Sequence, residues 1–139
     1  MNKIKSCKLV ITNFFYITNR MWKHAPRTKS DPSNLILVTE GTLHLKIGDK
    51  KYDVHQGEFV FLQQGIESIG YKPSEKPVGF YCIVFKSNPI PTFPTHFTIY
   101  DTAVVQELME QFVRKAYTHD YPADGIHSLL RIIFYIFKN

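Results

Sequence analysis

The chain has 139 residues, enough for one domain with its own hydrophobic core. Its content of 44% hydrophobic and 14% aromatic residues excludes a disordered chain. The 17 basic residues outnumber the 12 acidic ones, giving a net charge of +5. Because the basic residues are scattered and form no dense basic helix, this charge does not predict contact with nucleic acid.

The cysteines and the hydrophobic segments point to a cytoplasmic protein. Cys7 and Cys82 belong to no motif and are expected to be reduced, buried thiols. A disulfide between them remains an alternative, because the sequence does not give their separation in space. Asn13 interrupts the apolar start of the chain, which argues against a signal peptide. The apolar segment 129–137 contains Arg131 and is too short to span a bilayer.

The first third of the chain is expected to be extended. Residues 7–18 are rich in β-branched and aromatic side chains, which predicts one or two strands. Residues 21–27 are interpreted as a strand or an irregular edge, and residues 28–34 as a loop.

The stretch 35–68 carries the clearest β pattern. Leu43, Leu45 and Ile47 alternate with polar residues, which predicts a half-buried strand. Gly48-Asp49 predicts a hairpin turn. The unbroken apolar run 59–62 predicts a strand covered on both faces. Four extended segments with short turns predict an antiparallel meander, the local unit of a barrel or a sandwich.

Three further strands are predicted at residues 67–72, 78–85 and 95–100. In the second of them, Phe80 and Cys82 point to one side, while Tyr81 and Ile83 point to the other. Both sides are apolar. One side is therefore expected to face the inside of a barrel and the other to be covered by the segment that follows.

After residue 100 the hydrophobic period changes to that of a helix. Asp101 is a plausible N-cap. Behind it, five apolar residues recur at helical spacing and predict an amphipathic helix with one buried face: Val105, Leu108, Met109, Phe112 and Ala116.

A second helix is predicted from Asp124 onward, and it is apolar nearly all round. Such a helix needs cover on more than one side, and a second subunit is the simplest source. Burial within a single chain is the alternative. The predicted dimer interface consists of Leu129, Leu130, Ile133, Phe134 and Phe137.

The sequence shows no pattern for catalysis. Two imidazoles on one face of a strand must be two residues apart to reach one metal, and no two of the six histidines have that spacing. His44 lies on the polar side of its strand, which is typical of a surface residue. There is also no phosphate-binding loop and no cysteine nucleophile motif. We therefore expect no enzyme activity, no metal and no cofactor.

Two motifs resemble known families. Gly41 followed by residues 57–65, GEFVFLQQG, resembles the cupin pattern G-D-x-x-x-x-P-x-G-x-x-H, with Glu58 in place of the Asp and Ser68 in place of the His. The barrel pattern and the helix pair resemble, over residues 27–139, the N-terminal sensor and dimerisation domain of AraC-type transcription regulators. This resemblance implies a mainly β fold, namely a cupin-like antiparallel β-barrel (jelly roll) over residues 1–100, followed by two C-terminal α-helices over residues 101–139.

The resemblance also implies a small-molecule effector inside the barrel and a homodimer formed through the second helix. DNA would be bound by a helix-turn-helix domain beyond Asn139, where the chain is expected to continue. The candidate ligand-binding residues are Arg27, Ser68, Phe80, Cys82, Trp22 and Tyr71.

Phe80 and Cys82 are less polar than a sugar site requires, which favours a more apolar ligand or no ligand at all. Core packing is the alternative role of these candidates, and a surface charge is the alternative for Arg27. Two other functions stay open: a small metal-dependent cupin enzyme, such as an isomerase or dioxygenase, and a cupin-like module that binds a protein partner.

Overall fold

A computed structural model describes residues 8–91, 93–116, 128 and 131 of the chain. Within these residues the chain forms eight strands and one helix: β1 (Lys8–Arg20), β2 (Ser33–Glu40), β3 (Thr42–Ile47), β4 (Lys50–His55), β5 (Phe59–Leu62), β6 (Ser68–Gly70), β7 (Val78–Asn88), β8 (His96–Phe97) and α2 (Thr102–Ala116). Every predicted strand is present, and the residues 21–27 form an irregular edge with one isolated bridge, as expected.

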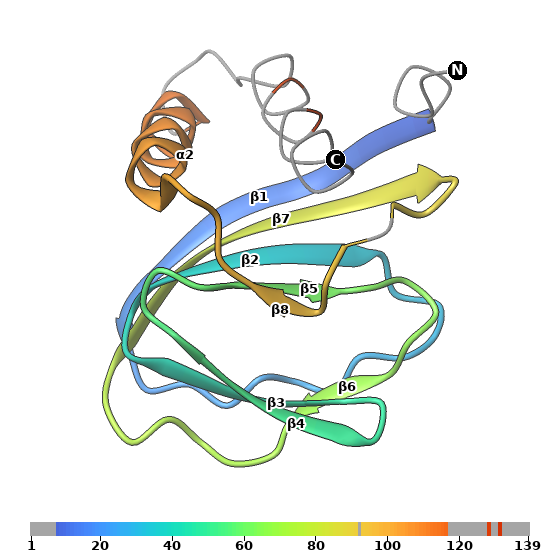
Figure 1. Ribbon diagram of the computed structural model, residues 1–139, viewed down its shortest axis with the longest axis vertical. Coiled ribbons are helices and arrows are strands. Elements are labelled where there is room, and N and C mark those ends of the chain that lie inside the picture. Colours follow the sequence, from blue (N-terminus) through green and yellow to red (C-terminus); the bar gives the residue numbers. More distant parts are fainter. Residues whose placement is uncertain (1–7, 92, 117–127, 129–130, 132–139) are drawn as a thin grey trace.

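The strands form two antiparallel sheets that face each other (Figure 1). The larger sheet has the order β1-β7-β2-β5-β8, and the smaller one has the order β4-β3-β6. Within the described part of the chain these are two separate sheets and not a closed barrel, so the predicted closure is not observed. The mainly β, antiparallel fold is confirmed.

The predicted meander is wrong, because β2 pairs with β5 and β7 instead of with β3. The β3–β4 hairpin, which is confirmed, belongs to the other sheet. The chain passes between the sheets at Gly41, whose φ is 71°. A Cβ atom at Gly41 would lie 2.6 Å from the carbonyl oxygen of Pro77, so only glycine fits. The β2–β5 pair thus encloses the β3–β4 hairpin, the nesting that is found in jelly rolls.

One hydrophobic core lies between the sheets. Leu43, Leu45 and Ile47 contribute to it from β3, and Phe80 and Cys82 from β7. All five side chains are buried. The predicted facing of β3 and of the inner side of β7 is therefore confirmed.

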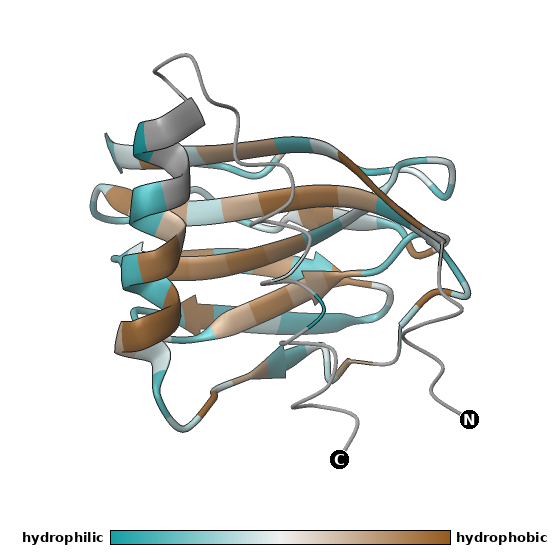
Figure 2. Ribbon diagram, turned by 90° about the horizontal axis from the view of Figure 1, so that it is seen from above, coloured by the Kyte–Doolittle hydropathy of each residue, from teal (hydrophilic) through white to brown (hydrophobic). Residues whose placement is uncertain are grey.

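A second core lies on the outer side of the larger sheet, under α2 (Figure 2). Tyr81 and Ile83 of β7 contribute to it, together with Val105 and Met109 of the helix. The Asp101 carboxylate accepts a hydrogen bond from Val104 N at 3.3 Å, which confirms the N-cap. Leu108, predicted to be buried, is 40% exposed, because the apolar stripe of the helix is wider than the face that the sheet covers.

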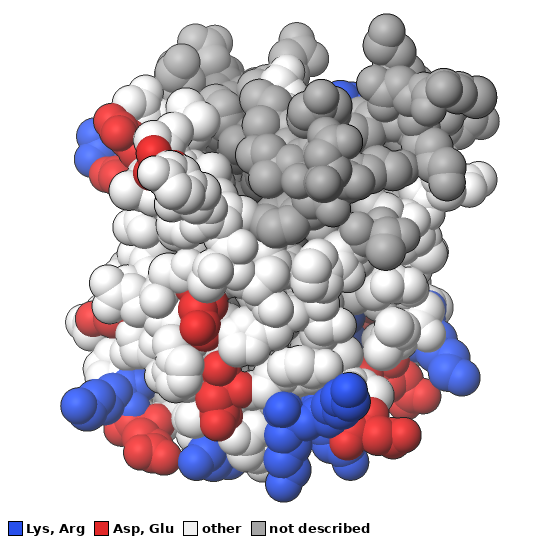
Figure 3. Space-filling view, in the orientation of Figure 1, with Lys and Arg blue, Asp and Glu red and all other residues white. Residues whose placement is uncertain are grey.

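The predicted second helix lies outside the described residues, apart from Ser128 and Arg131. This includes all the predicted interface residues: Leu129, Leu130, Ile133, Phe134 and Phe137. Cys7 is also outside, while Cys82 is a free, buried thiol, as predicted. In the described residues, no helix is long and apolar enough to cross a bilayer. Charged side chains gather around the small sheet in the view of Figure 3.

Candidate functional site

The segment between β1 and β2 runs beside β6 and brings Arg27 to Ser68. Arg27 N donates to Ser68 O at 2.7 Å, and Ser68 N donates back to Arg27 O at 3.3 Å. Further along, Gly70 N donates to His24 O at 2.9 Å. A Cβ atom on Gly70 would lie 2.6 Å from His24 N, so the absence of a side chain allows this close approach.

Arg27 is a buried cation that contacts neutral oxygens. Its residue is only 8% exposed. The guanidinium donates to Ser68 Oγ at 3.5 Å and to the carbonyl oxygen of Pro32. Burial lowers the pKa of Arg27, although the nearby Asp31 and Cys82 act in the opposite direction. Arg27 takes part in none of the four ion pairs among the described residues.

His24 stands near this cation and is uncharged at neutral pH. Burial, with a smaller contribution from the Arg27 charge, lowers the pKa of His24 to about 4. The indole Nε1–H of Trp22 donates to His24 Nδ1 at 3.4 Å. A neutral imidazole that accepts at Nδ1 carries its proton on Nε2, so His24 offers a donor there.

Apolar side chains complete the surroundings. The Trp22 ring meets Phe80 edge-on at 5.3 Å between centroids. Trp22 also packs against the core between the sheets, to which Phe80 and Cys82 belong. Burial raises the pKa of Cys82 to about 12, so this thiol is protonated and unreactive at neutral pH.

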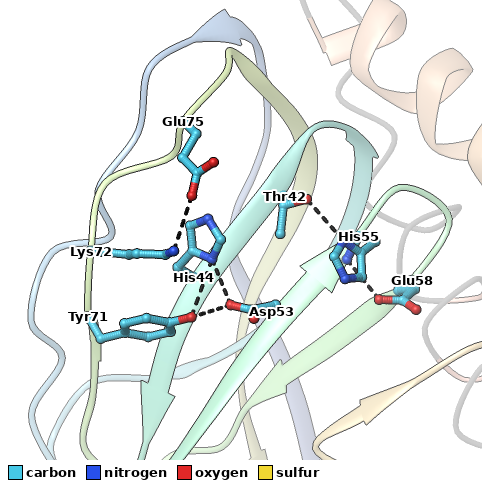
Figure 4. Close-up of polar contacts among 8 residues, drawn as sticks. All are labelled: Thr42, His44, Asp53, His55, Glu58, Tyr71, Lys72 and Glu75. Carbon is cyan, nitrogen blue, oxygen red and sulfur yellow. Dashed lines mark hydrogen bonds and ion pairs between the residues drawn. The ribbon is translucent and has the colours of Figure 1, made fainter.

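Tyr71 is separated from the other predicted site residues. It lies with His44 and Asp53 on the outward-facing side of the small sheet (Figure 4). His44 Nδ1 and Asp53 Oδ1 are 2.6 Å apart, and the Tyr71 hydroxyl donates to the same oxygen. The hydrogen bonds from His44 and Tyr71 lower the pKa of Asp53. The hydrogen bond between Tyr71 and Asp53 also raises the pKa of Tyr71.

Two hollows accompany these two groups. One of about 240 Å³ is lined by Arg27 and Ser68, with Lys46 and Glu67 also on its wall. The other, of about 350 Å³, lies on the outer face and is lined by His44, Asp53 and His55 among others. No group of three or more His, Cys, Asp or Glu side chains in the described residues is arranged to hold a metal ion.

The structure thus brings together five of the six predicted residues, and it adds His24, which the sequence analysis missed. His24 follows Trp22 by two residues in an extended segment, so both side chains are expected on the same side. That spacing was the signal that could have found it.

These features define a cupin-like β-domain, with a second core under a helix and a buried arginine beside the inner core. A family model described as the AraC-like ligand binding domain matches residues 12–127. The chain therefore belongs to the AraC-like ligand-binding domain family.

Solved structures with similar folds have low sequence identity to this chain. ToxT from Vibrio cholerae, with a bound unsaturated fatty acid, has a TM-score of 0.48 and 11% identity, covering 91% of this chain and 51% of its own. A cupin protein from Bacteroides fragilis has a TM-score of 0.43 and 12% identity, covering 63% of this chain and 72% of its own. KdgF from Halomonas sp. has a TM-score of 0.37 and 10% identity, covering 58% of this chain and 80% of its own. No curated protein matches the chain in sequence.

Proposed function

We propose that this domain is the effector-sensing and dimerisation part of a cytoplasmic transcription regulator and that it is not an enzyme. A small molecule binds between the two sheets, at Arg27, Ser68, Trp22, Phe80 and Cys82. The domain forms a homodimer through the segment after residue 124, and DNA is bound by a further domain of the regulator. The family supports the sensing role, and the buried arginine supports the location of the site.

The observation that carries this proposal is the burial of Arg27 without a carboxylate in contact among the described residues. Removing a charge from water costs several kcal/mol, by order of magnitude, unless an opposite charge or a full set of hydrogen bonds compensates. The guanidinium has five N–H donors, and the two neutral oxygens that accept from it offset only part of the cost of its burial. A group kept under such conditions is a candidate for function more than for stability.

Replacing the charge by an apolar side chain separates these two roles. A buried ion replaced by a hydrophobic residue of similar volume often leaves a protein equally or more stable. We expect Arg27→Met to keep the free energy of unfolding within about 1 kcal/mol of the wild type, or to raise it. A loss of several kcal/mol in urea denaturation would show instead that Arg27 holds its loop against β6.

Effector binding itself is tested by a thermal-shift screen of small molecules, followed by calorimetric titration. Compounds that bind between the sheets should raise the melting temperature of the wild type and lose affinity in Arg27→Met. The matched control is Arg114→Met, because Arg114 is an exposed helix residue paired with Glu110 at 2.6 Å. If no compound binds the wild type, the sensing role fails and a protein-interaction module becomes the better interpretation.

Dimerisation is tested by sedimentation velocity. The apolar segment predicts that Leu130→Lys converts the dimer to a monomer. Ser128→Lys adds the same charge at a neighbouring exposed residue and should leave the dimer intact. A wild-type chain that is monomeric at high concentration contradicts the dimer.

A further inference from the structure

The hollow of about 350 Å³ on the outward-facing side of the small sheet is lined by none of the residues of the proposed effector site. His44 of β3 is paired with Asp53 of β4. Thr42 and His55 form the neighbouring pair on the same face of the hairpin. These four side chains line the hollow. Its volume lies within the range of about 300–1,000 Å³ that is typical of small-molecule sites.

The other side of the hollow is formed by a loop that is anchored in its middle. Ser74 is buried, and its backbone N donates to Trp22 O at 2.7 Å. Trp22 N donates back to Ser74 Oγ at 2.8 Å. These two bonds hold the segment that brings Glu75 and Lys76 to the hollow. The hollow is therefore shaped by a hairpin and a fixed loop together.

The His44 imidazole is buried in this site but only half bonded. Its side chain is 9% exposed, although the sequence predicted a surface residue. Nδ1 contacts Asp53 Oδ1 at 2.6 Å, whereas Nε2 has no hydrogen-bond partner in the described part of the chain. Because Asp53 accepts at Nδ1, a neutral imidazole carries its proton there and leaves the Nε2 lone pair as an acceptor. A buried acceptor without a partner indicates that a donor is missing from the hollow.

The charges that line the hollow include one of each sign outside the existing ion pair. Lys72 Nζ lies 3.2 Å from Glu75 Oε1, so these two side chains compensate each other. Asp53 and Lys76 remain, and no Lys or Arg pairs with Asp53 and no acid with Lys76 among the described residues. A ligand with a single charge would be attracted by one of them and repelled by the other. A ligand that carries both charges satisfies the pair.

We propose that this hollow binds a small zwitterion, namely a free amino acid, whose ammonium group lies against Asp53 and His44 and whose carboxylate pairs with Lys76. The ammonium group brings three N–H donors. Asp53 Oδ1 already accepts from His44 and Tyr71, while its second oxygen has no partner among the described residues. In the view of Figure 4, the His44 ring stands between Asp53 and Glu75. This site goes beyond the proposed function and does not depend on an effector between the sheets.

The test is an NMR titration of the ¹⁵N-labelled chain with L-alanine and with two derivatives that each lack one charge. L-Alaninamide keeps the ammonium group, and N-acetyl-L-alanine keeps the carboxylate. L-Alanine should shift the amide resonances of the residues that line the hollow. It should bind about 10-fold or more tightly than either derivative, because each derivative loses one charge-assisted hydrogen bond.

Three variants assign the two charges. Asp53→Asn and Lys76→Met should each weaken L-alanine binding by about 10-fold or more. Lys76 is exposed, so its variant tests the site even if Asp53→Asn disturbs the fold. Asp49→Asn removes an exposed acid from the turn of the same hairpin and should keep the wild-type affinity.

The contrary outcomes are distinct. A derivative that binds as tightly as L-alanine would show a site for a single charge and overturn the zwitterion. The absence of any shift around the hollow would overturn the site itself. Shifts confined to Trp22 and Phe80 would also overturn it, while supporting a ligand between the sheets as in the proposed function.

Discussion

The half-buried imidazole of His24 makes a direct prediction about acid stability. Its pKa falls from 6.5 to about 4 on folding, mainly because burial disfavours the charged form. As the pH drops below about 6.5, the unfolded chain therefore takes up a proton that the folded chain refuses. The folded state loses stability across this window, from about pH 6.5 down to about pH 4.

The size of the loss follows from the shift. One pKa unit corresponds to about 1.4 kcal/mol. A pH of about 5 lies about 1.5 units below the pKa of His24 in the unfolded chain. At this pH, His24 alone therefore lowers the free energy of unfolding by about 2 kcal/mol. By about pH 4 the cost reaches about 3 kcal/mol, which is a large fraction of the stability of a small domain.

The assay is urea denaturation of the wild type and His24→Gln at several pH values between 7 and 5. Glutamine can still accept from Trp22 Nε1 but cannot take up a proton. We expect the free energy of unfolding of the variant to fall by about 2 kcal/mol less than that of the wild type over this range. His55→Gln removes an exposed imidazole and should keep the wild-type dependence. Equal losses in the wild type and His24→Gln would show that the His24 imidazole is not held in its neutral form by the fold.

Three further predictions follow from the fold. Met109→Ala should lower the free energy of unfolding by about 2–4 kcal/mol in urea denaturation, because Met109 of α2 is fully buried in the core on the outer side of the larger sheet. Leu108→Ala, at a 40% exposed residue of the same helix, should cost less than about 1 kcal/mol. Gly48→Ala should lower the free energy of unfolding by about 1 kcal/mol, because alanine is strained at the positive φ of this residue. Gly41→Ala should lower it clearly more in the same assay, because the added Cβ atom would also lie 2.6 Å from a backbone oxygen. Equal losses in the two variants would contradict this contact. In a Cys7→Ser variant, Cys82 should react with a thiol reagent only after unfolding in urea, because its folded pKa is about 12 and its side chain is buried; fast reaction with the folded chain would contradict that burial.

The sequence predicted the strands and their facing because both depend on local patterns. The alternation of Leu43, Leu45 and Ile47 determines which side of β3 is buried, and the same holds for Phe80 and Cys82 in β7. The pairing of strands could not be predicted in this way. A glycine turn such as Gly41 marks where a strand ends, but it does not say which sheet the next strand joins.

The sequence predicted only part of the site, because the site depends both on which side of a strand a residue faces and on which segments pair. Ser68 and Tyr71 are three residues apart, so in an extended chain they point to opposite sides, and the structure separates them accordingly. Grouping both in one site ignored this parity. The contact between Arg27 and Ser68 depends on a long-range pairing with no sequence signature, so only the resemblance to a family pointed to Arg27.

Strand β7 connects the candidate site to the helix, because its alternate residues belong to two different cores. Phe80 and Cys82 face the space between the sheets, while Tyr81 and Ile83 pack in the core beneath α2. A ligand against Phe80 would therefore be separated from the core under the helix by the thickness of one strand. Since packed cores transmit strain instead of absorbing it, a shift of β7 on the inner side changes the packing on the outer side. For the proposed sensor, this strand is a physical route from an effector between the sheets to the core that it shares with Val105 and Met109 of α2.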